Sequence, residues 1–390
     1  MLRGYKRPFE ERHKILSVIL KILFPLVVIL MIAGIIILPR TPLYTRHVAN
    51  TYSEKIFPKV AYMGNWFSDV FMFSITEMGV VIGSILVLCL IVMFFVYLIK
   101  SIKRKRFLKY IYKVFCFCLA IAFYATYSFM LMHGLNYKRD TADRRLGLKT
   151  QERKVEELYQ VQAWAYTGMI MARQQLGEDC NGVSHMKSSF PEAVFHANEL
   201  VSSVEKRFDL GLSETFVRAK PVMLSRYWSY THIVGVYDPF IGESNINVDY
   251  TATYDFPFTI CHELVHARGY AKEGDANFIA AIACTMSDRP DFRYAGYFEI
   301  FMSICGLLDN FDAFNGADMQ MVIRDIRAGN AYWDAKDVGK VAETIHEVSE
   351  KSNDSYLKAN GEEEGTETYV VDSNIYVEFF YDYVLPEISK

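Results

Sequence analysis

Long apolar stretches without charge are concentrated in the first third of the chain, and they predict three membrane-spanning helices. The stretches cover residues 15–38, 78–99 and 114–132, and Lys21 is the one charged residue inside them. A helix needs about 20 apolar residues to cross the hydrocarbon core of a bilayer, so each stretch is long enough. The first is too long for a cleaved signal peptide, and no small-residue cleavage pattern follows it.

Clusters of basic residues beside these stretches predict their orientation. Five of the first 14 residues are Lys or Arg, and six more lie between Lys100 and Lys109. Lys and Arg are retained on the cytoplasmic side of membrane spans. The N-terminus and the 100–109 connection are therefore expected in the cytoplasm, whereas residues 39–74 and the chain after about His133 are expected outside it.

The remaining two thirds of the chain alternate apolar and polar positions in the manner of a water-soluble fold. Helical periodicity covers residues 151–176 and 190–210, and strand-like sequence rich in Val, Tyr, Trp and Thr covers 221–251. Helical patterns resume after Pro257 and continue to the end. We expect an α+β, mostly helical fold, with a membrane region in residues 1–135 and one outer domain with a small sheet in residues 136–390.

Charge and cysteine content exclude two further classes of protein. The formal net charge is −3, which gives no electrostatic footprint for nucleic acid. Seven cysteines in 390 residues do not form a disulfide framework. A disulfide between Cys261 and Cys284 is compatible with the sequence, but nothing requires it.

The segment His262-Glu263-Leu264-Val265-His266 carries the chemistry that the sequence offers. Two histidines four residues apart lie on one face of a helix, so both imidazoles can reach one zinc ion. Glu263 lies beside them and can take a proton from a water molecule that the metal activates. Gly269 follows, and glycine can adopt the left-handed conformation that ends a helix.

A second helix is predicted to begin near Glu273. It would bury one face with apolar residues at helical spacing, namely Ala276, Ile279, Ala280 and Ala283. Glu273 can complete three protein ligands and leave a fourth position open. We favour it over Asp275, which is the alternative ligand. Asn277 lies one turn after Glu273 and could hold a histidine ligand from behind.

This pair of helices resembles the HExxH helix and the following Glu-x-x-Ala-Asn/Asp helix of gluzincin-type metallopeptidases. More closely, the chain resembles a family of uncharacterised bacterial multi-pass membrane proteins, the domain-of-unknown-function family 3810. The resemblance lies in residues 134–137 with Arg139, 237–247, 261–277 and 353–358. It implies a zincin-like metallopeptidase domain behind three membrane helices. The family usually has Glu where this chain has Asp275, and Ala-His-Gln where it has Val265-His266-Ala267.

The resemblance also implies further roles in the site. Residues 242–247, with Asn245 and Asn247, would form an edge strand beside the cleft, where an extended peptide could add as a strand. A polar turn is the alternative interpretation of these asparagines. Gluzincin sites often stabilise the oxyanion with Tyr or His. Tyr294, Tyr297 and Tyr356 are candidates for that role, and packing is the alternative for each.

Together these patterns favour a membrane-anchored zinc metallohydrolase, most simply a metallopeptidase that cleaves a peptide or protein outside the cytoplasm. His262, His266 and Glu273 would hold one Zn²⁺ ion, and Glu263 would act as general base. The alternative is a catalytically silent zincin-like sensor or scaffold of the envelope, against which the intact Glu263 argues. A transporter is disfavoured because the spans contain neither buried charge pairs nor broken helices. An intramembrane protease is excluded because charged residues flank the HExxH segment.

Overall fold

The computed structural model describes residues 14–149, 151–360 and 373–389, and this part of the chain forms two compact units. One unit contains the described residues up to Thr45 together with Val80–Leu131. The other contains Arg46–Gly79 and the chain from Met132 onward. The basic residues that precede Lys14 lie outside the described part.

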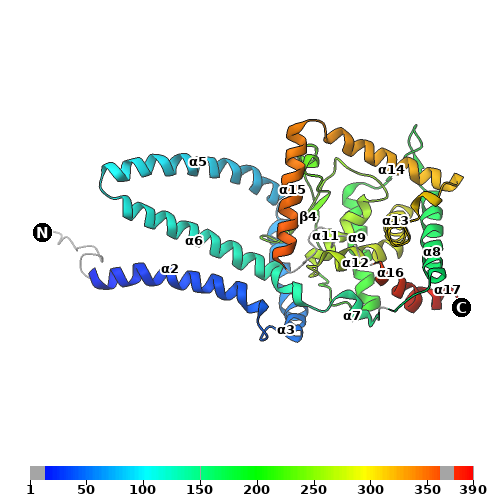
Figure 1. The fold of residues 1–390 in the computed structure, drawn as a ribbon, viewed down its shortest axis with the longest axis horizontal. Helices are drawn as coiled ribbons and strands as arrows, with labels where there is room; N and C mark the ends of the chain where they lie inside the picture. Colours follow the sequence, from blue (N-terminus) through cyan, green and yellow to red (C-terminus); the bar gives the residue numbers. More distant parts are fainter. Residues whose placement is uncertain (1–13, 150, 361–372, 390) are drawn as a thin grey trace. The chain divides into compact units, whose positions relative to one another are not determined.

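The first unit is built from helices α2 (Lys14–Ile37), α5 (Ile75–Lys103) and α6 (Phe107–Met132) (Figure 1). All three are long and apolar enough to cross a membrane, and their apolar windows contain few or no buried residues. They contain the predicted spans 15–38, 78–99 and 114–132 almost entirely. The three predicted apolar helices are thus confirmed, and their orientation stays a prediction.

Residues Arg46–Gly79, which we call the strap, belong to the second unit rather than to the unit of the apolar helices. The strap contains α3 (Arg46–Thr51), a π-helical turn (Tyr52–Ile56), α4 (Phe57–Asp69) and the first residues of α5. The division expected after residue 135 therefore differs from the observed one. Buried polar contacts explain the difference, because Glu243 accepts hydrogen bonds from Ser68 Oγ at 2.6 Å and from the Thr76 amide at 3.0 Å.

Five helices form the core of the second unit: α8 (Val155–Arg173), α9 (Phe190–Phe208), α11 (Phe256–Ala267), α12 (Glu273–Thr285) and α13 (Pro290–Leu308). The predictions of helices in 151–176 and 190–210 are confirmed. Ser189 and Glu192 form a capping box at the start of α9, where the Ser189 amide donates to Glu192 Oε2 at 2.8 Å. Helix α11, which carries the HExxH segment, is buried along its whole length except at Phe258.

Shorter and peripheral elements complete this unit. The remaining helices are α7 (Ala142–Leu146), α10 (Ser225–Trp228), α14 (Ala317–Lys336), α15 (Lys340–Ala359), α16 (Asn374–Phe379) and α17 (Leu385–Ile388). Strands β1 (Gly177–Glu178) and β2 (Ser184–His185) form a small antiparallel hairpin. The described chain is therefore mostly helical with small sheets, as expected.

The second sheet has three strands in the order β3 (Lys220–Pro221), β5 (Glu243–Ile246), β4 (Gly235–Asp238). Strand β5 pairs in parallel with β3 and antiparallel with β4, so it is the central strand. The expectation of an edge strand at 242–247 is therefore wrong, because both ladders of β5 are already occupied.

Asn245 and Asn247 are almost completely buried and have structural partners. Asn245 Oδ1 accepts a hydrogen bond from Ser74 Oγ at 2.5 Å, which ties β5 to the strap. Asn247 Nδ2 donates to Ser229 Oγ at 2.9 Å. Neither side chain is available to a substrate strand. Asn247 Oδ1 also accepts a hydrogen bond from the Asp249 amide at 3.0 Å, so the alternative of a polar turn fits Asn247 but not Asn245, which lies in β5.

Gly269 is a position where the fold requires glycine. Its φ is +111°, and a Cβ there would lie 3.0 Å from a ring carbon of Phe57 in the strap. We expect Gly269→Ala to lower the free energy of unfolding by about 1–3 kcal/mol. Thermal unfolding of the full-length protein in detergent measures the change.

The matched control is Gly306→Ala on the exposed side of α13, where a Cβ meets nothing within 4 Å. This change should be neutral or should stabilise the helix by about 0.5–1 kcal/mol. Equal unfolding temperatures for the two variants would contradict the strain assigned to Gly269.

Candidate metal centre

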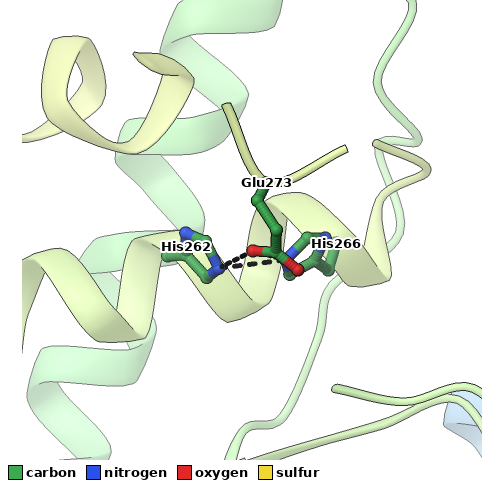
Figure 2. Close-up of side chains that lie close together, drawn as sticks. All are labelled: His262, His266 and Glu273. Atoms are coloured by element: carbon green, nitrogen blue, oxygen red, sulfur yellow. Dashed lines mark hydrogen bonds and ion pairs between the residues drawn. The ribbon is translucent and has the colours of Figure 1, made fainter. Parts of the chain in front are cut away.

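Helix geometry and one tight turn bring the candidate ligands together. His262 and His266 lie one turn apart on the same face of α11 (Figure 2). Gly269 then reverses the chain, so that only five residues separate the end of α11 at Ala267 from the start of α12 at Glu273. The first residue of α12 therefore faces the two imidazoles.

The three side chains converge closely enough to share one ion. The Nε2 atoms of His262 and His266 are 2.9 Å apart, and Glu273 Oε2 lies 3.2 Å from each of them. Among the described residues, these three form a group whose possible ligand atoms all lie within 4.8 Å of one another, close enough to hold one metal ion. Asp275 is directed elsewhere, since its Oδ1 accepts a hydrogen bond from the Ala142 amide at 2.8 Å. The geometry thus places Glu273, rather than Asp275, with the histidines.

Backbone contacts fix the orientation of His266. Its Nδ1 lies 2.7 Å from the carbonyl oxygen of Tyr270, which can only accept, so Nδ1 carries the proton. Nε2, the atom that would bind a metal, is then directed at the cluster. His262 Nδ1 is buried without a hydrogen-bond partner among the described residues.

The Tyr270 turn is held in place by Arg139, the residue that follows the third apolar helix by seven positions. The guanidinium of Arg139 donates to the carbonyl oxygens of Gly269 at 2.9 Å and Leu210 at 2.8 Å. It also lies 3.9 Å from the centre of the Tyr270 ring. Arg139 is itself 5% exposed, so these contacts satisfy a buried charge.

Glu263 lies beside the cluster and against the edge strand β4. A Cβ on Gly235 would come within 2.6 Å of Glu263 Oε1, so only glycine allows this approach. The carboxylate accepts a hydrogen bond from the Tyr237 amide, while its Oε2 has no partner among the described residues. Burial raises the pKa of Glu263 to about 7 against the opposing effect of the histidines. A carboxyl with this pKa can accept and return a proton near neutral pH.

Charge pairing within the cluster is strong. Burial alone would raise the pKa of Glu273, but His266 and His262 outweigh it and hold this pKa well below its usual range. Burial alone would lower the pKa of His266, but Glu273 outweighs it and raises the pKa to about 9. A cation that binds the cluster must therefore displace a proton from His266.

The structure brings two further residues to the cluster that the sequence did not identify, His133 and Tyr237. The His133 ring lies 5.8 Å from that of His266 and 5.5 Å from that of Tyr237. Burial, together with His266, lowers the pKa of His133 to about 3, so its imidazole is neutral. Tyr237 OH donates to the Met132 carbonyl at 3.3 Å. His133 adjoins the stretch 134–137, and Tyr237 begins the stretch 237–247. Both stretches carry the family resemblance, which was the one signal in the sequence that pointed to these residues.

The three tyrosines that are candidates for an oxyanion role have different surroundings. Tyr294 OH donates to Asp325 Oδ2 at 2.8 Å, next to the buried Arg173–Asp325 ion pair, so it serves packing. Tyr297 packs against Gly168 and Trp164 of α8. For these two tyrosines the contacts favour the alternative interpretation, packing, over a role at the oxyanion. Burial raises the pKa of Tyr237, and Tyr356, half-buried on α15, is near enough to add to this effect.

Two further sequence features concern residues at the packing of α11 on α12. Cys261 and Cys284 are free thiols with sulfur atoms 3.7 Å apart, and both are fully buried. Asn277 is buried on α12, one turn after Glu273. Its predicted support of a histidine ligand stays a prediction.

The cluster itself is nearly closed to solvent. His262, Glu263, His266 and Glu273 are between 4% and 8% exposed. A pocket of about 510 Å³ opens at the N-terminal end of α11 and is lined by residues 248–254 together with residues of α14. None of the four cluster residues lines it.

Two imidazole nitrogens and one carboxylate oxygen form a donor set that suits zinc, and the N–O separations of 3.2 Å suit ligands of one small ion. The orphaned Oε2 of Glu263 adds a buried acceptor beside them. The residues present therefore fit a zinc ion.

The family model described as "Protein of unknown function (DUF3810)" matches residues 52–372 of the chain. The match includes part of the strap, two of the three apolar helices and the whole cluster. No curated protein and no solved structure matches the chain.

A pair of half-buried carboxyls near the start of α11 allows a test of the electrostatics. Burial raises the pKa of Asp255 to about 6, and burial together with Asp255 raises that of Glu299 on α13 to about 7. Between its unfolded pKa and pH 7, Glu299 binds more protons in the folded state. Its contribution to stability is therefore lost as pH rises through this window.

We expect Glu299→Gln to unfold at a higher temperature than the wild type above pH 7, and at the same temperature near pH 4.5. The gain should be on the order of 1–3 kcal/mol, since each pKa unit corresponds to about 1.4 kcal/mol. The exposed Glu350→Gln on α15 is the control and should show no such dependence. A pH-independent difference between Glu299→Gln and the wild type would show that the charge of Glu299 is not the cause.

Proposed function

The chain belongs to the DUF3810 family, and we propose that it is a membrane-anchored zinc metallohydrolase, most simply a metallopeptidase with a gluzincin-like site. The observation that carries the proposal is the convergence of His262, His266 and Glu273 beside the unpaired carboxylate oxygen of Glu263. A structural zinc site has no use for an adjacent base and usually closes all four coordination positions with protein ligands.

The roles of the residues follow from their contacts. His262, His266 and Glu273 would hold the ion, with His266 oriented by the Tyr270 carbonyl. When bound, zinc supplies a Lewis acid that polarises a substrate carbonyl and makes water a stronger acid. Glu263 would take the proton from the attacking water at its free Oε2 and return it to the leaving amine. Tyr356 remains the candidate among the three tyrosines for a hydrogen bond to the oxyanion.

The proposed location is the outer face of the cell membrane. Three helices able to span a bilayer anchor the chain, and the basic residues beside them favour an N-terminus in the cytoplasm. The cluster would then act outside the cytoplasm on a peptide or protein. Nothing in the charge of the chain favours nucleic acid as a partner.

A second candidate function is a catalytically silent metal-stabilised sensor or scaffold of the envelope. The burial of the cluster favours it, because a polypeptide substrate could not reach side chains that are 4–8% exposed without movement of the elements around them. The close contact of Glu263 with Gly235 in β4 has the same implication. The two candidates share the metal and differ in turnover.

Metal content is the first test. Full-length wild-type protein should contain about one zinc per chain by elemental analysis, and Glu263→Gln should retain it. His266→Ala should lose it, because removal of one of three ligands weakens binding by more than the roughly 10–100-fold cost of losing a supporting contact. Asp275→Asn is the matched control, since it changes an acid on the same helix outside the cluster. Absence of zinc from folded wild type, or retention in His266→Ala, would contradict the proposal.

Turnover separates the two candidate functions. Zinc-loaded wild type should cleave members of an unbiased peptide mixture, as followed by mass spectrometry, and zinc-loaded Glu263→Gln should be slower by about 100-fold or more. Bound zinc with no cleavage by either protein would favour the scaffold.

A further inference from the structure

Helix α4 of the strap has its two faces reversed with respect to an ordinary surface helix. One face contacts the rest of the second unit. Beyond Phe57 at its start, this face carries the small or polar residues Ala61, Asn65 and Ser68, all of them buried. The opposite face carries large apolar residues that are 48–70% exposed, namely Tyr62, Met63, Trp66 and Phe67. A helix at a water-exposed surface normally has its polar residues outside.

The apolar surface continues beyond the end of the helix. Val70, Met72 and Phe73, in the connection to α5, are also exposed. The rings of Phe67, Phe71 and Phe73 lie next to one another, with centroids 5.9 Å and 5.5 Å apart. A contiguous apolar surface of this kind marks an interaction site. We call Tyr62–Phe67 and Val70–Phe73 together the apolar face of the strap.

The chain itself identifies what covers this face. Five residues separate the apolar helix that ends at Arg40 from α3, which begins at Arg46. Five more separate the end of α4 at Asp69 from α5, which begins at Ile75. Five extended residues reach at most about 18 Å, so both ends of the strap are tethered close to a bilayer that α2 and α5 enter.

We propose that the apolar face of the strap lies in the interfacial layer of the bilayer, with α4 parallel to the membrane plane. Trp and Tyr, here Trp66 and Tyr62, are the residues that concentrate at the level of lipid headgroups. Amphipathic helices at this level bury their apolar face about 5–10 Å into the boundary between headgroups and acyl chains. The exposed Lys55 and Lys59 on the strap can contact lipid phosphates.

The buried face of the same helix contacts the turn between the two helices that carry the candidate metal centre. Phe57 packs against Gly269 in the turn between α11 and α12, and Gly64 packs against the backbone of Ile241. A membrane-bound strap therefore holds the His266–Glu273 turn about one helix diameter, roughly 10 Å, from the lipid headgroups. The inference about lipid rests on the strap alone and does not depend on metal binding.

Fluorescence quenching by brominated lipids tests the location of Trp66. Full-length wild type and Trp66→Phe are reconstituted separately into phosphatidylcholine nanodiscs whose acyl chains are brominated near the headgroup or near the chain end. The difference between the two emission spectra belongs to Trp66. We expect this difference emission to be blue-shifted and to lose most of its intensity with the shallow bromines, and less with the deep ones. Trp66 is exposed, so the change to Phe should not impair folding.

Trp333→Phe provides the matched control, because Trp333 of α14 is covered by Tyr250 and His232 in the same unit. Its difference emission should be unaffected by either lipid. Difference emission from Trp66 that neither bromine position quenches would overturn the proposal. Discs that hold a single copy separate lipid from a second copy of the chain: blue-shifted emission that needs two copies per disc would also overturn it.

Discussion

The Arg139 guanidinium is the contact on which the geometry of the candidate metal centre depends. It gathers the carbonyl oxygens of Leu210, Gly211 and Gly269 and stacks on Tyr270. A buried charge needs several acceptors to offset its desolvation, and here the acceptors come from two separate loops. The same contact fixes the Tyr270 carbonyl that orients His266. Loss of the Arg139 guanidinium would therefore disturb the candidate ligands, although Arg139 touches none of them.

The cluster illustrates how ionisable groups are kept inside a protein. Two imidazoles and a carboxylate are buried together, and their mutual attraction offsets the cost of removing them from water. Without a metal, that attraction retains a proton on His266 and a charge on Glu273. A zinc ion would replace the proton and satisfy all three groups, so its affinity would depend on pH. His133 does not compete with His266 for the charge of Glu273, since burial keeps the His133 imidazole neutral.

The strap lies in the chain between the apolar helices α2 and α6 and packs against the sheet of the second unit. Its polar side chains supply hydrogen bonds to Glu243 and Asn245 in the central strand, which are buried and need partners. Its small residues allow close approach to the β4–β5 turn, as at Gly64. The large apolar residues are left for the outer face, where lipid rather than water is the proposed neighbour. One helix thus satisfies two different environments by dividing its residue types between two faces.

The sequence by itself determined the three apolar helices, the helices of the second unit, the HExxH face and the preference for Glu273. All of these depend on spacing within a few turns of one helix or on the length of one apolar run, and such local periodicity can be read directly. Tertiary structure alone decided that β5 is a central strand, because strand order depends on partners far apart in the chain. It also decided that Tyr294 and Tyr297 serve packing, that His133 and Tyr237 adjoin His266, and that the strap joins the second unit. Each of these outcomes is set by long-range packing and by the need to pair buried polar groups, and neither leaves a periodic signal in the sequence.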